Sequence, residues 1–173
     1  MPDPSGEALA TSRLLALPEL AGLPAGSTVT CYVAVGAEPG TALLITALVG
    51  RGLRVLVPVV LPDLDLDWAV DGDQRVAGLG PGVLEPTGPR LGVDAIADAA
   101  VVIAPALGVD RRGRRLGQGG GSYDRALARR RPDAFVVALL HDGEIWDDDL
   151  PADAHDQPVH AAVTPHETAR FTG

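Results

Sequence analysis

The chain has 173 residues, of which 46% are hydrophobic and 3% aromatic, and it carries a formal net charge of −9 at pH 7. This length suits a single domain with a sizeable core, which aliphatic side chains must fill. The charge argues against a general nucleic-acid binder and against docking on an anionic membrane, because both need a basic face. Lysine is absent, so all 14 basic residues are arginines and no catalytic lysine is available.

Cysteine content and terminal sequence indicate the compartment. The single cysteine, Cys31, excludes a disulfide within the chain and argues against a cysteine-based metal cage. Residues 1–4 lack the basic-then-apolar pattern of a signal peptide. No stretch approaches the ~20 apolar residues of a membrane span. We therefore expect a cytoplasmic protein whose partners include neither nucleic acid nor membrane.

Apolar runs and turn residues predict helices and strands that alternate along the chain. Spacing of apolar residues predicts helices at residues 7–17, 40–49, 94–99 and 123–130. Apolar and β-branched runs predict strands at residues 28–35, 53–60, 64–70, 100–104, 134–140 and 160–164, the third of them half-exposed. Glycine, proline and charged residues predict loops at residues 72–92, 111–121 and 142–158.

Several predicted strands are apolar on both faces, as residues 100–104 and 134–140 illustrate. Strands buried on both faces belong in a mainly parallel sheet covered by helices, so we expect an α/β fold. Ligands bind such sheets at loops that leave the C-terminal ends of strands. Two segments fit that position, residues 105–121 and 141–158.

The segment that most clearly suggests ligand binding is residues 114–125, RRLGQGGGSYDR. Its glycines let backbone N–H groups converge on a ligand, and Arg114 and Arg115 add positive charge. The segment therefore predicts an anion site, with phosphate as the expected ligand. It is not a P-loop, which needs lysine, and the dinucleotide fingerprint fails because position 122 is serine. On the residues alone, a flexible turn with a solvated arginine cluster is an equally good interpretation.

The same segment belongs to a longer pattern that runs from about Leu14 onward. Its main part comprises Pro105-Ala106-Leu107, Asp110, Gly113, Arg115-Leu116-Gly117, Gly119-Gly120-Gly121, Tyr123-Asp124-Arg125 and Leu127. Weaker landmarks in the expected order are Tyr32, Glu38, Thr41, Pro58, Glu85-Pro86, Leu150-Pro151, His155-Asp156 and Val163-Thr164. Together they resemble the 5-formyltetrahydrofolate cyclo-ligase family, also called 5,10-methenyltetrahydrofolate synthetases.

The resemblance implies one domain over residues 1–173, folded as a three-layer α/β/α sandwich. It implies a ligase that uses ATP and Mg²⁺ to convert 5-formyltetrahydrofolate to 5,10-methenyltetrahydrofolate, releasing ADP and phosphate. The formyl oxygen is a poor leaving group, and its phosphorylation lets N10 close the ring. The expected partners are small-molecule substrates, and the expected state is a monomer.

The resemblance also implies roles for individual residues. By this resemblance, Arg115, Gln118 and Tyr123 are the expected catalytic residues. ATP phosphates would be held by Arg115, Leu116, Gly117, Gln118, Gly119, Gly120, Gly121, Ser122 and Tyr123. The folate would contact Val33, Glu38, Gln118, Gly119, Gly120, Gly121 and Ser122. Mg²⁺ would be held by Asp124 and Asp156. On the residues alone, Glu38 and Asp156 are better interpreted as exposed loop acids.

Two departures from the family pattern bear on activity. Ser122 stands where members usually have the first of two tyrosines, which removes a ring from the loop. Members usually begin with a basic helix whose lysine and arginine reach the ATP phosphates, and from the resemblance we expect that helix to be missing here. One alternative is therefore a folate- or nucleotide-binding protein with weak or no turnover. A second is another enzyme on a related scaffold, such as a sugar-phosphate isomerase or a CoA transferase, which would need no ATP.

The remaining polar and aromatic residues receive structural interpretations. The acidic run 147–149 predicts a solvated loop rather than a metal site. Trp68 and Tyr32 are expected to pack in the core, and Cys31 to be a buried, inert thiol. The histidines are expected to be structural or at the surface, and two of them, His160 and His166, show no partner spacing.

Overall fold

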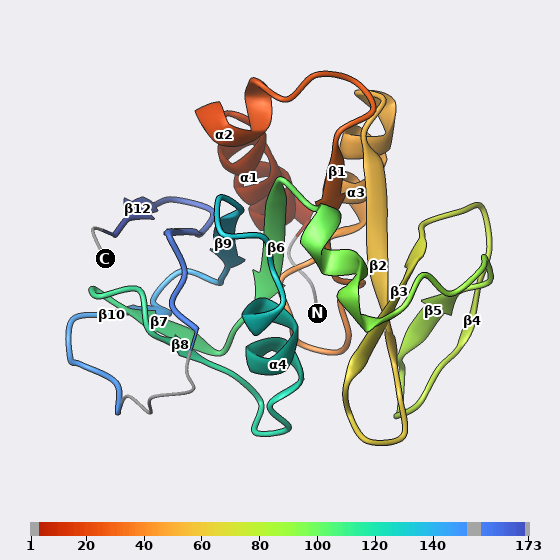
Figure 1. The fold of residues 1–173 in the computed structure, drawn as a ribbon. Coiled ribbons are helices and arrows are strands. Elements are labelled where there is room, and N and C mark those ends of the chain that lie inside the picture. The colour runs from red at the N-terminus through yellow and green to blue at the C-terminus, as the bar shows by residue number, and fades with distance from the viewer. Residues whose placement is uncertain (1–3, 152–156, 172–173) are drawn as a thin grey trace.

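A computed structural model of the chain describes residues 4–151 and 157–171. Its centre is a seven-stranded sheet in the order β12-β11-β9-β6-β1-β2-β3 (Figure 1). Five neighbouring strands are parallel, and the two edge strands, β12 and β3, pair antiparallel. The strands are β1 (Thr28–Thr30), β2 (Arg54–Val60), β3 (Leu66–Val70), β6 (Val101–Pro105), β9 (Phe135–Leu139), β11 (Ala161–Val163) and β12 (Thr168–Arg170).

Both faces of this sheet are buried, because the apolar strands alternate their side chains between two cores. In β6, Val101 and Ile103 join one hydrophobic cluster and Val102 joins the other. One face is covered by α1 (Pro4–Leu15), α2 (Pro18–Ala21) and α3 (Ala42–Gly50). The opposite face carries the 3₁₀ helix η1 (Val93–Asp98) and α4 (Ser122–Ala128). The α/β class with helices on both faces is confirmed.

The helices are short, and their apolar residues are committed to the sheet. Leu14 of α1 and Leu44 and Leu48 of α3 are fully buried in the first cluster. The carboxylate of Glu7 accepts a hydrogen bond from the Leu43 amide at 3.1 Å, which ties α1 to the start of α3. None of the helices in the described ranges has the length and apolarity to cross a membrane.

Three segments predicted as loops contain short strands. Two of these strands, β4 (Arg75–Ala77) and β5 (Leu84–Pro86), form a hairpin that projects from the sheet (Figure 1). The others, β7 (Gly108–Asp110), β8 (Arg115–Leu116) and β10 (Ile145–Trp146), form a small sheet in the order β10-β7-β8. These strands have two or three residues, too few to show an alternating pattern in the sequence.

Close packing holds this small sheet together at Gly108. A Cβ at that position would lie 2.5 Å from the indole ring of Trp146. Only glycine fits under the ring, so β10 can approach β7 closely. Trp68 of β3 has no exposed surface, as its expected packing role requires. Strand β3 is therefore mostly buried rather than half-exposed, because η1 and α4 cover it.

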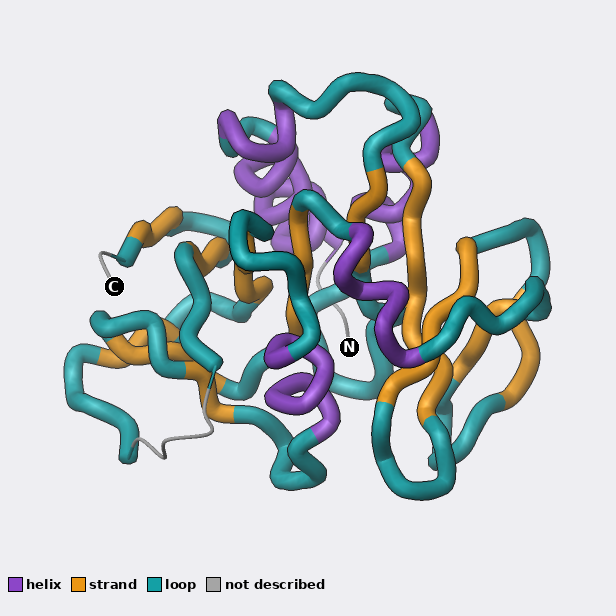
Figure 2. Tube along the Cα trace, viewed as in Figure 1, coloured by secondary structure: helices purple, strands orange, loops and turns teal. Residues whose placement is uncertain are grey.

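The connectivity changes direction at β1, whose neighbours in the sheet are β2 on one side and β6 on the other. The chain moves outward from β1 to β2, and later returns to β6 and continues toward β11. Loops that leave β1 and β6 therefore diverge and leave a crevice beyond the C-terminal ends of the strands. Figure 2 shows long loop segments at this edge, including the glycine-rich segment before α4.

Candidate active site

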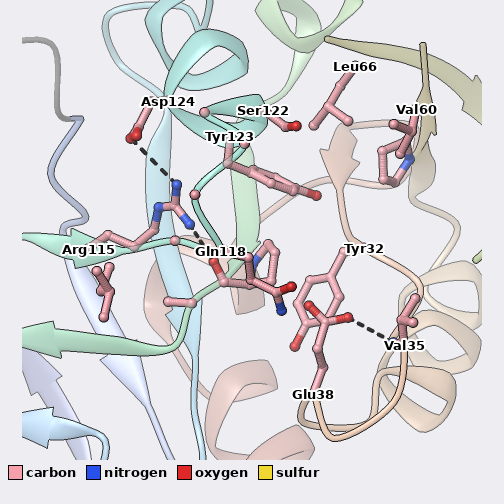
Figure 3. A pocket seen from close by; sticks show the side chains of 18 of the residues that line it. Tyr32, Val35, Glu38, Val60, Leu66, Arg115, Gln118, Ser122, Tyr123 and Asp124 are labelled. Carbon is pink, nitrogen blue, oxygen red and sulfur yellow. Dashed lines mark hydrogen bonds and ion pairs between the residues drawn. The ribbon is translucent and has the colours of Figure 1, made fainter. Parts of the chain in front are cut away.

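A cavity of ≈ 500 Å³ occupies the crevice at the C-terminal edge of the sheet (Figure 3). Its walls come from the segments that follow β1 and β6, from the facing ends of β2 and β3, from the β4–β5 hairpin and from the start of α4. Its lining is formed by Tyr32, Val33, Val35, Glu38, Pro58, Val60, Leu66, Val83, Leu84, Pro105, Ala106, Arg115, Leu116, Gly117, Gln118, Gly119, Gly120, Gly121, Ser122, Tyr123, Asp124, Leu150 and Pro151. Both segments predicted to bind ligand contribute to it.

The glycine-rich loop, residues 117–121, forms one wall with its backbone. Gly119 and Gly121 adopt φ values of +97° and +70°, which side chains other than glycine rarely accept. No hydrogen-bond partner from the described residues is found for the amides of Gly119, Gly120 and Gly121. Free amides beside a cavity are donors for an anionic ligand, as the sequence predicts.

Arg115 supplies the positive charge of this wall. Its guanidinium donates to the carbonyl of Pro105 at 2.8 Å and lies 3.5 Å from the carboxylate of Asp124. Only 4% of the side chain is exposed to solvent. Gly117 packs against it, since a Cβ there would lie 3.1 Å from Nη2. The arginine is therefore held in place at the cavity by the backbone around it.

Arg114 does not join Arg115 at the anion site, which corrects the expectation that both flank it. It donates to the buried carboxylate of Asp110 at 2.7 Å and lies 3.4 Å from Asp149. The reason is the local backbone: Arg115 begins strand β8, where consecutive side chains point to opposite faces. One arginine of the pair therefore faces the cavity and the other the small sheet.

Asp110 anchors the segment that carries Arg115. Its side chain has no exposed surface and accepts from the amides of Arg112, Arg114 and Leu150, each at 2.9 Å. Burial by itself would raise the pKa of this carboxyl, but these amides and the Arg114 guanidinium outweigh it and lower the pKa. Asp110 thus joins the cavity wall at Leu150 to the start of β8.

Tyr123 offers a polar group that the protein itself leaves unpaired. Figure 3 shows its ring reaching from α4 into the space between Arg115 and Val60. The hydroxyl is buried and finds no hydrogen-bond partner among the described residues. The Arg115 guanidinium lies 5.7 Å from the centre of the ring. Burial strongly raises the pKa of this phenol, so it stays protonated and can donate to a ligand.

Glu38 stands across the cavity from the glycine-rich loop, in the loop that follows β1 (Figure 3). Its Oε1 accepts from the Val35 amide at 2.8 Å, so the acid folds back on its own loop. Burial raises the pKa of Glu38 above its ordinary value of 4.5. A half-buried carboxylate facing a cavity suits a ligand that presents several N–H donors.

A second cavity of ≈ 650 Å³ lies behind the Glu38 loop. Three carboxylates line it, those of Glu7, Glu38 and Asp142, together with His141 and no arginine from the described residues. His141 Nε2 lies 2.6 Å from the carbonyl of Ala37 and so joins this loop to the end of β9. An acidic lining is unsuited to phosphate, which leaves Arg115 and the glycine-rich loop as the phosphate-binding candidates.

The structure brings the predicted site residues together with one exception. All those predicted for ATP and folate line the first cavity, and so does the metal candidate Asp124. The other metal candidate, Asp156, lies outside the described residues. Ser122 lines the cavity, but its hydroxyl donates to the carbonyl of Leu64 rather than remaining free for a ligand.

Sequence reasoning assigned Val33 to the folate but missed most of the apolar side of the cavity. Val83 and Leu84 come from the β4–β5 hairpin, which was predicted as loop, and Tyr32 was expected only in the core. Tyr32 is buried and donates to the Pro39 carbonyl at 3.1 Å while its ring also lines the cavity. No local signal marks Val83 or Leu84, because their place depends on the fold of the hairpin.

The expected roles of the isolated thiol and histidines are largely structural. Cys31 is buried, and burial raises the pKa of its thiol. His160 Nδ1 accepts from the Val136 amide at 2.9 Å, and His166 Nδ1 lies 2.6 Å from a carboxylate oxygen of Asp142. Both histidines therefore do have partners, which lie 24 residues away and so leave no spacing pattern.

Comparisons with known proteins agree on one family. Residues 4–165 match the sequence model of the 5-formyltetrahydrofolate cyclo-ligase family. The 5-formyltetrahydrofolate cyclo-ligase of Mycolicibacterium smegmatis is 40% identical over 152 residues, covering 84% of this chain and 78% of the relative. The Escherichia coli enzyme of the same name is 31% identical over 142 residues, covering 80% of this chain and 78% of the relative.

Solved structures support the fold. The Aquifex aeolicus 5,10-methenyltetrahydrofolate synthetase superposes with a TM-score of 0.76 at 24% identity, covering 96% of this chain and 81% of that one. The Mycoplasma pneumoniae synthetase superposes with a TM-score of 0.71 at 17% identity, covering 93% and 85%. At these identities the similarity establishes the architecture, and the sequence matches establish the family.

Proposed function

The chain belongs to the 5-formyltetrahydrofolate cyclo-ligase family, and from that membership we propose that it converts 5-formyltetrahydrofolate and ATP to 5,10-methenyltetrahydrofolate, ADP and phosphate. Family membership makes it a ligase. The observation that carries the finer proposal is the pairing, in one cavity, of free glycine amides with Arg115 on one side and Glu38 on the other. Two chemically different ligands would meet between them.

The phosphate side of the cavity would hold the ATP. Amides of Gly119, Gly120 and Gly121 have no other partner in the described chain, and Arg115 lies beside them. Phosphoryl transfer depends mainly on positioning and on stabilising charge, which such donors supply without a covalent enzyme intermediate. The Tyr123 phenol is a further donor at this wall, and its raised pKa excludes it as a base near neutral pH.

The acid at this wall fits a divalent cation that is carried by the nucleotide. Asp124 is 32% exposed and lies beside Arg115 at the edge of the cavity. No group of three potential metal ligands occurs among the described residues. Mg²⁺ prefers one or two carboxylates with phosphate oxygens and water, so this donor set suits Mg²⁺ bound with ATP. Asp124 would hold it, and the ion would neutralise charge on the transferring phosphoryl group.

The folate would occupy the apolar side of the cavity. Val33, Val60 and Leu66 offer an apolar surface for the pterin ring, and Glu38 accepts from its N–H groups. The formyl group on N5 would then face the glycine-rich loop and Gln118 across the cavity. This arrangement brings the formyl oxygen to the phosphates, as transfer requires.

The proposed reaction has two steps. The formyl oxygen attacks the γ-phosphorus of ATP, the bond to the β-phosphate oxygen breaks, and ADP leaves. N10 then attacks the activated formyl carbon, loses its proton, and expels the oxygen with the phosphate. Arg115 and the glycine amides would stabilise the charge on the transferring group in the first step and on the departing phosphate in the second.

The binding-only alternative is not favoured. The relatives carry the name of the enzyme, and this chain covers 78% of each of the two bacterial relatives described above. The isomerase and transferase alternatives have no support from the family match over residues 4–165.

The proposed function is tested by following methenyltetrahydrofolate by absorbance with 5-formyltetrahydrofolate and ATP present. We expect product only when ATP is present, with ADP formed in equal amount. Chelation of Mg²⁺ with EDTA should stop product formation, and excess Mg²⁺ should restore it. Product formed without ATP, or ATP hydrolysed without folate turnover, would contradict the proposal.

Replacing Glu38 with glutamine should weaken the binding of 5-formyltetrahydrofolate and leave the binding of ATP unchanged. Loss of a charged acceptor should raise the KM for 5-formyltetrahydrofolate about 10- to 100-fold, while the KM for ATP stays unchanged. The Tm should not fall, because the amide keeps the bond from Val35 and avoids the burial of a charge. Steady-state kinetics with each substrate varied, and thermal unfolding, measure both effects.

The pH dependence of the same KM gives a second check on Glu38. Because burial raises the pKa of this carboxyl, protonation should begin at a higher pH than for an ordinary glutamate. The wild-type KM for folate should therefore rise on acidification, and the Glu38→Gln variant should lose that dependence. An equal pH dependence in both proteins would show that Glu38 does not act through its charge.

A further inference from the structure

The turn between β2 and β3, residues 61–65, is joined to α4 and to the residue that follows it by three side chains. The Ser122 hydroxyl donates to the carbonyl of Leu64. Arg125 Nη1 donates to the carbonyl of Asp63 at 3.2 Å. Arg129 makes two bonds to the carboxylate of Asp65, at 2.7 and 2.6 Å. We call these contacts the turn clasp; they connect the glycine-rich loop to a strand pair on the far side of the cavity.

Arg125 also holds the glycine-rich loop directly. Its Nη2 donates to the carbonyl of Gly120 at 3.0 Å and its Nε to that of Gly121 at 3.4 Å. In a trans peptide the carbonyl and the following N–H point in opposite directions. These bonds therefore turn the amides of Gly121 and Ser122 away from Arg125. Arg125 does not itself line the cavity, so it acts on those amides and not on a ligand.

The turn is built at a conformational cost. Leu64 has φ +68°, the only positive φ outside glycine in the described chain. Leucine is disfavoured there, because its Cβ crowds the backbone. Burial of an apolar side chain does not explain why leucine occupies this position, since 47% of Leu64 is exposed. Strained backbone of this kind persists where the surroundings require it, and it is common beside functional sites.

Other contacts show that the turn is closed and pressed against the loop. The Leu64 amide donates to the Leu61 carbonyl at 2.8 Å, and the Asp65 amide to the Asp63 carboxylate at 3.0 Å. A Cβ added at Gly120 would lie 3.4 Å from the Leu64 side chain. The strand ends on either side, Val60 and Leu66, line the cavity. The turn therefore contacts both sides of the cavity: the apolar side, which includes Val60 and Leu66, and the glycine-rich loop at Gly120.

We propose that Ser122 and Arg125 are positioning residues, which use the strained β2–β3 turn to orient the amides of Gly121 and Ser122 toward the triphosphate of ATP. This inference rests on the proposed function of the glycine-rich loop. It gives Ser122 a role through its hydroxyl that differs from direct ligand contact. The clasp sets the geometry of donors that would otherwise be free to rotate on four glycines.

The first test replaces Arg125 with methionine. The KM for ATP should rise about 10- to 100-fold, while the KM for 5-formyltetrahydrofolate and the Tm stay close to wild type. Arg125→Lys should give a KM for ATP between those of wild type and Arg125→Met, because its compact ammonium lacks the planar fork that reaches three carbonyls at once. Arg51→Met is the matched control: Arg51 is exposed and donates to the Leu15 carbonyl at 3.3 Å, away from both cavities. Equal KM values for ATP in Arg125→Met and Arg51→Met would overturn the proposal.

A second test needs no ligand. NMR backbone order parameters over residues 117–122 should be lower in Arg125→Met and Ser122→Ala than in wild type or Arg51→Met, because the loop loses the bonds that hold it. Unchanged order parameters would overturn the clasp even if the enzyme were active. Wild-type protein that makes no product would instead count against the proposed function, and the order parameters would still decide the clasp.

Leu64→Gly distinguishes positioning from stability. Glycine accepts the positive φ, so the Tm should equal or exceed that of wild type. The KM for ATP should nevertheless rise, because the turn loses the rigidity that holds Ser122. A lower Tm with an unchanged KM for ATP would mean that the turn serves stability alone, which contradicts the proposal.

Discussion

Arg115→Met is expected to lower kcat about 10²- to 10³-fold, as removal of one oriented donor to a developing charge does in other enzymes. Among the residues that the structure describes, Arg115 is the only arginine in the cavity lining, and its side chain is almost fully buried. A charge in that environment is screened little by water, so its effect on phosphoryl transfer is large. Initial rates under saturating ATP and folate measure the effect.

Two comparisons make this result specific. Arg115→Lys keeps the charge but not the planar fork that reaches Pro105 and Asp124, so it should recover only part of the rate. Arg114→Met removes the neighbouring arginine, which faces Asp110, and should affect Tm more than kcat. If Arg115→Met kept the wild-type kcat with a normal Tm, the assignment of Arg115 to the phosphates would be wrong.

Asp110→Ala is expected to lower the free energy of unfolding by about 3–5 kcal/mol, the usual effect of removing one partner from a buried ion pair. The carboxylate is fully buried and satisfies three amides and the Arg114 guanidinium. Its loss leaves those donors without a partner. Denaturant unfolding of the wild type and of Asp110→Ala measures the difference. The free energy of unfolding of Asp110→Asn should fall between those of these two proteins.

The same group makes stability depend on pH. The folded-state pKa of Asp110 is below the ordinary value of 3.8, so its contribution is complete above that value. The contribution is lost as the pH falls through the lower folded-state pKa. The stability difference between wild type and Asp110→Ala should therefore shrink below about pH 4. A difference that stays constant to pH 2 would show that the charge of Asp110 is not what stabilises the fold.

The core and most of the cavity are predictable from the sequence because their signals are local. Apolar runs such as residues 100–104 and 134–140 identify strands buried on both faces, and these became β6 and β9. Four glycines between arginine and an acidic helix start identify the anion wall. A side chain whose type and position both match a local pattern, such as Arg115, is found without knowledge of the fold.

The rest depends on contacts between distant segments. The β4–β5 hairpin has partly exposed strands of three residues in a segment rich in glycine and proline, so no periodicity marks it. The Ser122 hydroxyl bonds a carbonyl 58 residues away, and Asp110 reaches the Leu150 amide 40 residues away. Local patterns carry no information on such pairs, which is why Asp110 is visible in the sequence only as a family landmark.

The packing of Trp146 on Gly108 gives the chain a built-in optical reporter. The chain has two tryptophans, and Trp68 has no exposed surface, so a change in the solvent exposure of an indole is expected mainly from Trp146. Trp146 is half-buried on the small sheet whose other edge strand, β8, begins with Arg115. A shift of that sheet when a ligand engages Arg115 would change the surroundings of the Trp146 indole. Occupancy of the phosphate wall can therefore be followed as a change in ultraviolet emission, without a label and before any turnover.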